Sequence, residues 1–362
     1  MKKGVLFYSA VIFLPFLAVI ICLQWLLVSP YEPIYLLEKG KIKSYIWDKK
    51  TDILVPQLNV AETYLKMPVL RKTDKTISVA SIDGYKQYLY DKDLSTYRLV
   101  QESKVKYTTP KNVAVLYIAT GKYIVFWENF YKQTEKYFLP RHKKTYFLFT
   151  DHDDLKVPEN VVKIHQDQLP WPYVTFKRFH FFEGIEKELK KFDYVYFLNG
   201  TMLPTKEIHE EIFPTKEQGV MVTLHPGYWS AKNKRFPYDR NPKSKAYIPN
   251  GHGIHYFMGG FNGGTAEGFL KLIKTCREWS DIDMKNNQMP AWHDESMLNS
   301  YILNEIYRGG GYPLILFPEY AIPQDSGGWG LDELYPYEKM IIINKQKHGG
   351  HAFLRGQSDD KK

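Results

Sequence analysis

The sequence predicts an α/β domain that follows an N-terminal transmembrane helix and a stem. Three observations support this expectation. Residues 4–28 form an apolar run without a charge, and residues 29–110 mix Lys, Asp, Tyr and Thr with short apolar runs. From residue 112 onward, apolar strands alternate with amphipathic helices. This alternation is typical of α/β domains, whereas the middle stretch lacks a long amphipathic period and is read as a stem that partly packs on the domain behind it.

Composition sets the first limits on function. The chain has 362 residues, a formal net charge of +9 and 16% aromatic residues, so it has enough apolar material for a large core and is not a disordered chain. Two cysteines cannot build a disulfide framework or a Cys-based zinc site. The positive charge suits anionic membranes, nucleic acid or phosphorylated substrates, and it does not choose between them.

The apolar run over residues 4–28 predicts a retained membrane anchor after a short cytoplasmic tail, residues 1–3. Its 25 residues would span about 37 Å as a helix, more than the roughly 30 Å of a hydrocarbon core. A cleaved signal peptide is the alternative, but its apolar region would be shorter and end at a small-x-small site. Lys2 and Lys3 predict a cytoplasmic amino end, hence a single-pass type II protein. The domain would face the Golgi lumen in a eukaryote and lie across the inner membrane in a bacterium, which argues against nucleic acid as a partner.

The first half of the domain has four expected strands, at residues 112–118, 145–149, 161–164 and 194–198. An expected helix after the first strand has one apolar face, made of Ile124, Trp127, Phe130, Tyr131, Thr134 and Phe138. A second expected helix has another, made of Phe176, Phe179, Phe182, Ile185, Leu189 and Phe192. Ligands of such sheets bind beyond the carboxyl ends of the strands, so Thr120 and Asn199 are candidate site positions.

The second half begins with a strand at 219–224 and continues as a polar, Gly-rich stretch to residue 264. A helix is expected near 265–280, with Phe269, Leu272, Ile273, Cys276 and Trp279 on one face. Another helix is expected to start near Asp294. The last 20 residues predict a mobile basic tail with a Gly-Gly hinge, of which residues 357–362 are the polar end.

Several motifs are absent or incomplete. No Walker loop, G-x-S-x-G or H-E-x-x-H sequence occurs. The Asp151-His152-Asp153 run has acidic spacing that can bind a metal–nucleotide, although such runs are usually solvated loops, and the paired histidines at 252/255 and 348/351 are too few for a metal site. Asn199-Gly200-Thr201 is formally a glycosylation sequon but abuts a buried strand. Trp292 stands beside two carboxylates, which also fit an acidic helix start.

Five blocks of sequence carry a resemblance to a known family: 117–123, 236–240, 246–249, 256–264 and 292–296. In order, they read YIATGKY, FPYDR, AYIP, YFMGGFNGG and WHDES. They resemble family 6 glycosyltransferases, which include the blood-group A and B transferases and the α-1,3-galactosyltransferases. The resemblance covers residues 111–356 and is greatest to bacterial members. It implies a GT-A (Rossmann-like) fold, a UDP-sugar donor, and α-1,3 transfer with retention onto galactose.

The chain departs from the animal members at one motif. Most of them have Asp-x-Asp where this chain has Asn199-Gly200-Thr201. Bacterial members have Asn-x-Asn there and need no metal, so the resemblance implies that no cofactor is required, with Mn²⁺ conceivable but not expected. Neutral side chains are poor sole ligands for Mn²⁺ or Mg²⁺. Lys345 and Arg355 match a basic pair in the bacterial tail, which would supply countercharge to the diphosphate. The anchor and stem are instead features of animal Golgi enzymes.

The resemblance also assigns roles to single residues. Arg178, whose alternative is a surface helix charge, and Asp294 would contact the donor sugar, and Glu295 is the expected catalytic carboxylate. The other donor residues are Ile118, Thr120 and Tyr123 at the uridine, Asn199 and Thr201 at the ribose or diphosphate, and Lys345 and Arg355. The acceptor galactose would meet His225, Trp292 and Glu295, and donor choice would depend on Gly227, Met258 and Gly260.

These observations lead to one hypothesis and one alternative. The hypothesis is a retaining glycosyltransferase that moves GalNAc or Gal from a UDP-sugar to a galactose-terminated glycan. A fucosylated acceptor is expected on the resemblance alone. Glu295 would attack the anomeric carbon or stabilise an oxocarbenium ion, and the sequence leaves both open. The alternative is a catalytically silent, membrane-anchored glycan-binding protein. The missing acidic motif favours this alternative, and the intact Asp294, Glu295, Lys345 and Arg355 oppose it.

Overall fold

The computed structural model describes the seven strands between residues 31 and 102, and residues 109–357 except 230–234, 254, 308–312, 326–330 and 332–337. Every helix in this part of the chain is too short or too polar to cross a membrane. The anchor expected over residues 4–28, the tail of residues 1–3 and most of the polar end lie outside the described residues.

Seven strands between residues 31 and 102 form a closed sheet within the segment expected to be a stem. All neighbours pair antiparallel except β1 and β7, whose parallel pairing closes the sheet. Ile34, Tyr45 and Leu54 are buried. The strands are Tyr31–Glu38 (β1), Lys41–Asp48 (β2), Ile53–Pro56 (β3), Met67–Lys72 (β4), Thr76–Ser81 (β5), Gly84–Asp91 (β6) and Thr96–Glu102 (β7). The sequence analysis indicated only short apolar runs here, because these strands mix charged and polar residues with apolar ones.

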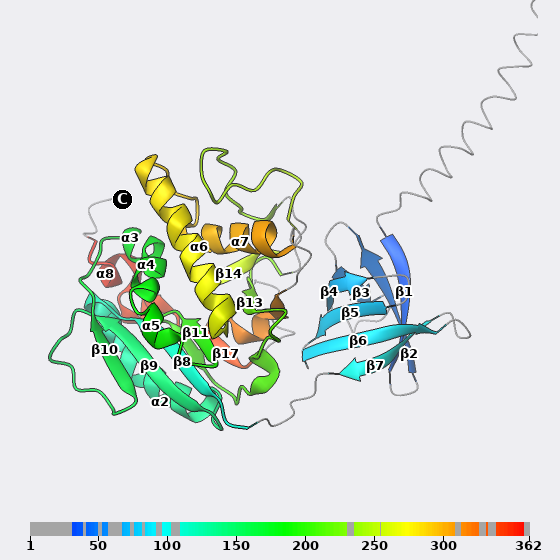
Figure 1. Cartoon of the computed structure of the whole chain (residues 1–362), viewed down its shortest axis with the longest axis horizontal. Coiled ribbons are helices and arrows are strands. Elements are labelled where there is room, and N and C mark those ends of the chain that lie inside the picture. Colours follow the sequence, from blue (N-terminus) through cyan, green and yellow to red (C-terminus); the bar gives the residue numbers. More distant parts are fainter. Residues whose placement is uncertain are drawn as a thin grey trace, which may run out of the picture.

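A second, seven-stranded sheet forms the centre of the rest of the chain, in the order β10-β9-β8-β11-β14-β13-β15 (Figure 1). Its strands are Asn112–Ile118 (β8), Lys143–Thr150 (β9), Val161–His165 (β10), Tyr194–Leu198 (β11), Val220–Leu224 (β13), Phe257–Thr265 (β14) and Leu314–Leu316 (β15). The five strands expected from the sequence are confirmed. β14 runs antiparallel to β11 and β13, and the remaining pairs are parallel. The expected α/β class is therefore confirmed.

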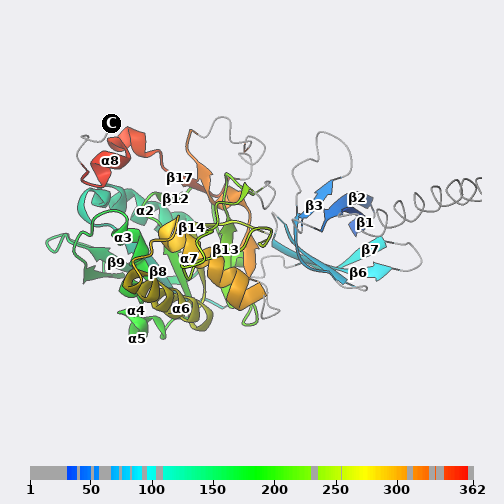
Figure 2. The same cartoon turned by 90° about the horizontal axis from the view of Figure 1, so that it is seen from above.

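Helices cover both faces of this sheet (Figure 2). One face packs against η1 (Gly121–Phe126), α2 (Trp127–Tyr137) and a small sheet of β12 (Met202–Pro204), β17 (Met340–Ile342) and β16 (Ile322–Pro323). The other face packs against α3 (Tyr173–Phe176), α4 (Arg178–Glu183), α5 (Glu186–Leu189), α6 (Ala266–Lys285) and α7 (His293–Tyr301). Short helical turns complete the chain at η2 (Glu210–Ile212), η4 (Ile302–Tyr307) and η5 (Pro318–Tyr320).

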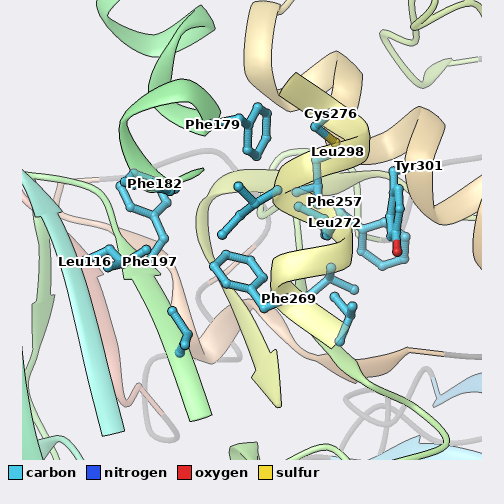
Figure 3. Close-up of a cluster of buried hydrophobic side chains, with 14 of the residues drawn as sticks. Leu116, Phe179, Phe182, Phe197, Phe257, Phe269, Leu272, Cys276, Leu298 and Tyr301 are labelled. Carbon is cyan, nitrogen blue, oxygen red and sulfur yellow. The ribbon is translucent and has the colours of Figure 1, made fainter. Parts of the chain in front are cut away.

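The larger core lies between the sheet and helices α4, α6 and α7. In Figure 3, Phe182 lies over Leu116 and Phe197 of the sheet, and Phe179 faces α6. The apolar face expected for α6 is confirmed: Phe269, Leu272, Ile273 and Cys276 are fully buried, and Trp279 packs against them. Removing one such aromatic side chain costs about 3–5 kcal/mol, so this layer holds the site elements in place.

Two expectations about local structure need correction. The aromatic positions from Phe176 to Phe192 do face the core, but the expected single helix is three short ones, interrupted at Lys177 and near Gly184. Glycine is a poor helix former, which accounts for the second interruption. The Gly-rich stretch before residue 264 contains β14, a central strand that the sequence analysis did not predict. Its small residues let neighbouring backbones approach closely, as at Gly263 and Gly264.

The tail expected to be mobile folds into two turns of helix. Asn344 accepts a hydrogen bond from the Gln346 N–H and caps η7 (Lys345–His348). Gly349 and Gly350 follow with φ of +88° and +81°, a region that favours glycine, and α8 (Gly350–Leu354) continues the chain. The Lys122 ammonium lies 3.5 Å from the ring centroid of Phe353, so α8 packs against η1 beside the carboxyl end of β8.

Candidate active site

A pocket of about 240 Å³ opens at the carboxyl ends of β8 and β11. These two neighbouring parallel strands mark the point where the strand order reverses, which is where ligands bind in open α/β sheets. The antiparallel strand β14 begins at the same edge. Eleven of the residues singled out from the sequence line this pocket: Ile118, Thr120, Tyr123, Arg178, Asn199, Gly260, Trp292, Asp294, Glu295, Lys345 and Arg355.

The end of β8 supplies one wall of the pocket. The Tyr117 hydroxyl donates to the Gly200 carbonyl at 2.8 Å and so ties the ends of β8 and β11 together. Thr120 is extended, and Gly121 then turns the chain into η1 with φ of +54°, which brings Tyr123 to the pocket. The Asp151 carboxylate accepts from the Gly121 N–H at 2.8 Å. Asp151 of the acidic run therefore stabilises the turn.

The Asn199-Gly200-Thr201 turn follows β11. The Asn199 N–H donates to the Gly260 carbonyl at 2.8 Å, and its Oδ1 accepts from both the N–H and the hydroxyl of Thr201 at 3.3 Å. Asn199 and Gly200 line the pocket, whereas Thr201 is buried behind them. Within the described ranges, no group of three or more His, Cys, Asp or Glu side chains could hold a metal ion.

A buried ion pair forms the floor of the pocket. The Arg178 guanidinium donates to Asp294 Oδ2 at 2.8 Å and to the Gly259 carbonyl at 2.6 Å. It also lies 4.5 Å from the Phe197 ring centroid. Arg178 is only 2% exposed, so it is not the surface charge considered as the alternative. Its Nε and Nη2 have no hydrogen-bond partner among the described residues. Burial raises the pKa of Asp294, and the charge of Arg178 opposes this rise.

Glu295 is held through both carboxylate oxygens. The Tyr256 hydroxyl donates to Oε1 at 2.6 Å, and the Gly259 N–H donates to Oε2 at 2.7 Å. Burial raises the pKa of Glu295, and these two hydrogen bonds and the charge of Arg178 oppose the rise. Glu295 and Asp294 are adjacent in the first turn of α7. The Glu295 carboxylate nevertheless binds the start of β14 and the residue just before that strand, whereas Asp294 pairs with Arg178 of α4.

Two cations from the tail also line the pocket. The Arg355 guanidinium carbon lies 3.6 Å from the ring centroid of Trp171, and the Lys345 ammonium lies 6.0 Å from that of Tyr123. Burial, and then the charge of Arg355, lower the pKa of Lys345 to about 8. The same cavity is therefore lined by a cationic pair from the tail and by the carboxylates of Asp294 and Glu295.

The residues expected at the acceptor are divided between the pocket and its surroundings. Trp292 lines the pocket and is 51% exposed, so one part of its ring is free for a second ligand. His225 is half-buried between Tyr228 and Tyr256 and does not line the pocket. Burial lowers its pKa to about 4, and its Nδ1 accepts from the N–H of the exposed Gly227.

Comparison with known proteins agrees with this geometry. The sequence model of glycosyltransferase family 6 matches residues 96–329, more than half of the chain. The chain belongs to glycosyltransferase family 6. The matched range contains the pocket residues from Ile118 to Glu295, while Lys345 and Arg355 lie beyond it. An α/β sheet rich in parallel strands fits the GT-A-like fold that the family resemblance implied.

Named relatives come from bacteria and animals. The chain is 31% identical over 217 residues to the O-antigen biosynthesis glycosyltransferase WbnI of Escherichia coli, covering 59% of this chain and 89% of that protein. It is 31% identical over 240 residues to the histo-blood group ABO system transferase 1 of Rattus norvegicus, covering 64% of this chain and 66% of the relative. It is 30% identical over 206 residues to the globoside alpha-1,3-N-acetylgalactosaminyltransferase 1 of Gallus gallus, covering 53% of this chain and 57% of that relative. The match thus spans most of the bacterial relative and one half to two thirds of the animal ones.

Three positions were expected to set donor choice in this family 6 member. Gly260 lines the pocket, whereas Met258 is buried behind it and Gly227 is exposed outside it. A Cβ added at Gly260 would lie 2.7 Å from the terminal methyl of Met258. Gly260 and Met258 are therefore coupled through packing, and an added methyl group at Gly260 requires Met258 to move.

The family 6 pocket also contains residues that the sequence analysis did not assign to the site. The most informative is Gly259, whose N–H binds Glu295 and whose carbonyl accepts from Arg178. A Cβ there would lie 3.2 Å from Glu295 Cβ, so any larger residue would require Glu295 to move. The others are Gln168, Leu169, Trp171, Val174, Thr175, Phe197, Gly200, His293 and Leu354. Gly259 and His293 lie in blocks that carried the family resemblance, and Gly200 lies in the Asn199-Gly200-Thr201 motif, although the sequence analysis gave none of the three a role.

Proposed function

We propose that the chain is a retaining α-1,3-glycosyltransferase that moves GalNAc or Gal from a UDP-sugar to a galactose-terminated glycan. The observation that carries this proposal is the charge of the pocket lining. One cavity brings together the cations Lys345 and Arg355 and the carboxylates Asp294 and Glu295. A nucleoside diphosphate sugar has matching chemistry, because cations suit its anionic diphosphate and carboxylates suit the hydroxyls of its sugar. The ABO and globoside transferases among the relatives support the reaction class.

Donor binding follows from the chemistry of the lining residues. Ile118, Thr120 and Tyr123 offer an apolar and aromatic wall for the uridine. Lys345, Arg355 and the Asn199 amide would meet the diphosphate. The Arg178–Asp294 pair lines the pocket, and the second oxygen of Asp294 would accept from the hydroxyls of the sugar. Thr201 supports Asn199 from behind.

In the transfer step, the bond between the sugar C1 and the phosphate oxygen breaks, and UDP leaves with the bonding electron pair. The positive charges of Lys345 and Arg355 stabilise the leaving diphosphate. The acceptor O3 forms the new bond to C1, and its proton passes to the departing diphosphate. The Glu295 carboxylate lines the pocket, where it would stabilise the oxocarbenium-like transition state through its charge or attack C1 first and be displaced by O3. The half-exposed Trp292, with His225 nearby, would support the acceptor galactose.

Two finer features belong to the same proposal. The reaction needs no metal, because Asn199 and Thr201 replace the carboxylates that would hold one. The donor is UDP-GalNAc rather than UDP-Gal, because Gly260 leaves room beside the sugar for an acetamido group. Met258 is the residue that favours UDP-Gal. Its effect on donor choice is smaller than that of a steric clash in a packed site, which costs about 1–3 kcal/mol.

The proposal includes membrane attachment. The uncharged run over residues 4–28 behind Lys2 and Lys3 favours a signal anchor with the domain on the far side of the membrane. Carbonate extraction of membranes and protease protection of a carboxyl-terminal tag test this directly. A tag that a cytosolic protease cleaves in intact cells would contradict the orientation.

The full chain incubated with UDP-GalNAc, UDP-Gal or UDP-glucose, and with galactosides with or without an α-1,2-linked fucose, tests the activity. We expect UDP release and a product with an α linkage to O3, identified by NMR. A protein that binds the galactosides but releases no UDP from any donor would instead be the silent glycan-binding protein.

A further inference from the structure

The orientation of the Glu295 carboxylate depends on a residue that does not line the pocket. Tyr256, immediately before β14, donates its hydroxyl to Glu295 Oε1 at 2.6 Å. The Gly259 N–H donates to the other oxygen at 2.7 Å. Two donors on two different oxygens fix the plane of a carboxylate, whereas one donor would leave it free to rotate about the final side-chain bond.

Tyr256 is itself rigidly held. Its side chain is 1% exposed and packs in a cluster with Phe236, Tyr238 and Ile248. The ring centroid of Tyr256 lies 5.5 Å from that of Tyr238 and 5.3 Å from that of Tyr228. Its carbonyl accepts from the His225 N–H at 2.9 Å. The hydroxyl therefore reaches Glu295 from a packed aromatic wall, and it cannot follow the carboxylate if that group turns away.

We propose that Tyr256 is the positioning residue of the Glu295 carboxylate, which it holds in one orientation within the pocket. This inference rests on the proposed function, because it gives Tyr256 a role in the same transfer reaction. Tyr256 does not line the pocket, so it acts through Glu295 rather than by touching the sugar.

The charged and titratable groups around Glu295 set its pKa, and a change in that pKa measures the role of Tyr256. Arg178 from α4 favours the ionised carboxylate, and the neighbouring Asp294 pairs with that same arginine. The buried Cys276 on α6 faces Arg178, and His293 faces Asp294. Burial raises the pKa of Tyr256, so its hydroxyl remains a proton donor throughout the working range. Removing this hydroxyl takes away an interaction that lowers the pKa of Glu295, so that pKa rises.

The test compares Tyr256→Phe with Tyr238→Phe in the full chain. Both variants remove one buried hydroxyl from the same aromatic cluster, but the Tyr238 hydroxyl donates to the His255 carbonyl rather than to Glu295. For Tyr256→Phe we expect kcat to fall about tenfold, in line with loss of a hydrogen bond to a charged group, and KM for the donor to change by less than about threefold. The acidic limb of the pH–rate profile should move upward by about one pH unit. Tyr238→Phe should leave that limb in place.

Two results would overturn the inference: an unmoved acidic limb in Tyr256→Phe, or the same displacement in Tyr238→Phe. A double-mutant cycle of Tyr256→Phe and Glu295→Ala, read as the unfolding temperature, needs no activity. We expect the effects of the two single changes not to add, because Tyr256→Phe removes the donor and Glu295→Ala removes the acceptor of the same hydrogen bond. Additive effects would refute the contact. If the wild type releases no UDP but the cycle is non-additive, the proposed function fails and the positioning contact stands.

Discussion

Arg178 and Asp294 form an ion pair with a 2.8 Å contact inside the protein, where their side chains are 2% and 13% exposed. The pair joins α4 to the first turn of α7. Gly259 binds both Arg178 and Glu295, because its carbonyl accepts from the guanidinium and its N–H donates to the carboxylate. One short backbone segment of β14 thus connects the two carboxylates that the sequence places side by side.

The first prediction concerns the stability that depends on this pair. Arg178→Ala leaves the Asp294 carboxylate buried without its partner, so the free energy of unfolding should fall by about 3–5 kcal/mol. Arg277→Ala is the control, since Arg277 forms a bidentate but partly exposed pair with Glu183. That change should cost about 1 kcal/mol or less. Chemical unfolding followed by tryptophan fluorescence measures both, and equal losses would contradict the special role of the buried pair.

The second prediction follows from the pKa of Lys345, which burial and the charge of Arg355 lower to about 8. Lys345 is charged below that pH and neutral above it. Affinity for UDP should therefore weaken as the pH rises through about 8, and this dependence should be reduced in Lys345→Met. Lys347→Met is the control in the same turn, because Lys347 pairs with Asp325 on the surface. Calorimetric titration of UDP at several pH values gives the answer, and an identical pH dependence in Lys345→Met would exclude Lys345 from the diphosphate site.

The third prediction concerns metal. With Asn199 and Thr201 at the end of β11, the transfer rate should change by less than about twofold in EDTA. Asn199→Asp would place a negative charge at the proposed diphosphate position, so its rate without metal should fall and should increase when Mn²⁺ is added. A wild-type enzyme that EDTA silences and Mn²⁺ restores would refute metal independence.

Much of this site could be predicted from local sequence. Strands β8 and β11 are uninterrupted apolar runs, and the rule that ligands bind at carboxyl strand ends led directly to Thr120 and Asn199. The apolar face of α6 was equally clear, because Phe269, Leu272 and Cys276 recur at helical spacing.

Other features depend on contacts between distant segments. Nothing near Arg178 in the sequence shows that it is buried, because its partner Asp294 lies far along the chain. β14 escaped prediction because glycine has a low strand propensity. Its glycines are present because the neighbouring backbones approach too closely for a larger side chain. The closed sheet between residues 31 and 102 escaped prediction because its strands mix charged and polar residues with apolar ones and lack the uninterrupted apolar runs of β8 and β11. The tail reaches the pocket only after η7 and α8 fold against η1, which no local pattern indicates.

The fourth prediction tests donor choice. Gly260→Ala adds a Cβ that would lie 2.7 Å from the Met258 methyl group, so Met258 must move and the pocket changes shape. We expect the ratio of kcat/KM for UDP-GalNAc to that for UDP-Gal to fall about tenfold. Gly259→Ala is the matched control, since its Cβ would meet Glu295 Cβ at 3.2 Å and Asp294 Oδ2 at 3.3 Å. It should lower kcat with both donors and leave the ratio unchanged. An unaltered ratio in Gly260→Ala would exclude this wall from donor selection.

The most direct test of the account is the turnover of Glu295→Gln, because the substitution removes the charge of this side chain and nearly preserves its shape. The rate of sugar transfer from UDP-GalNAc and the Kd for UDP should be measured on the same preparations of both proteins. We predict that kcat falls by about 100-fold or more while the Kd for UDP changes by less than about threefold, since Glu295 acts on the transition state rather than on the nucleotide. A Glu295→Gln enzyme that transfers sugar within a few fold of the wild-type rate would contradict the account.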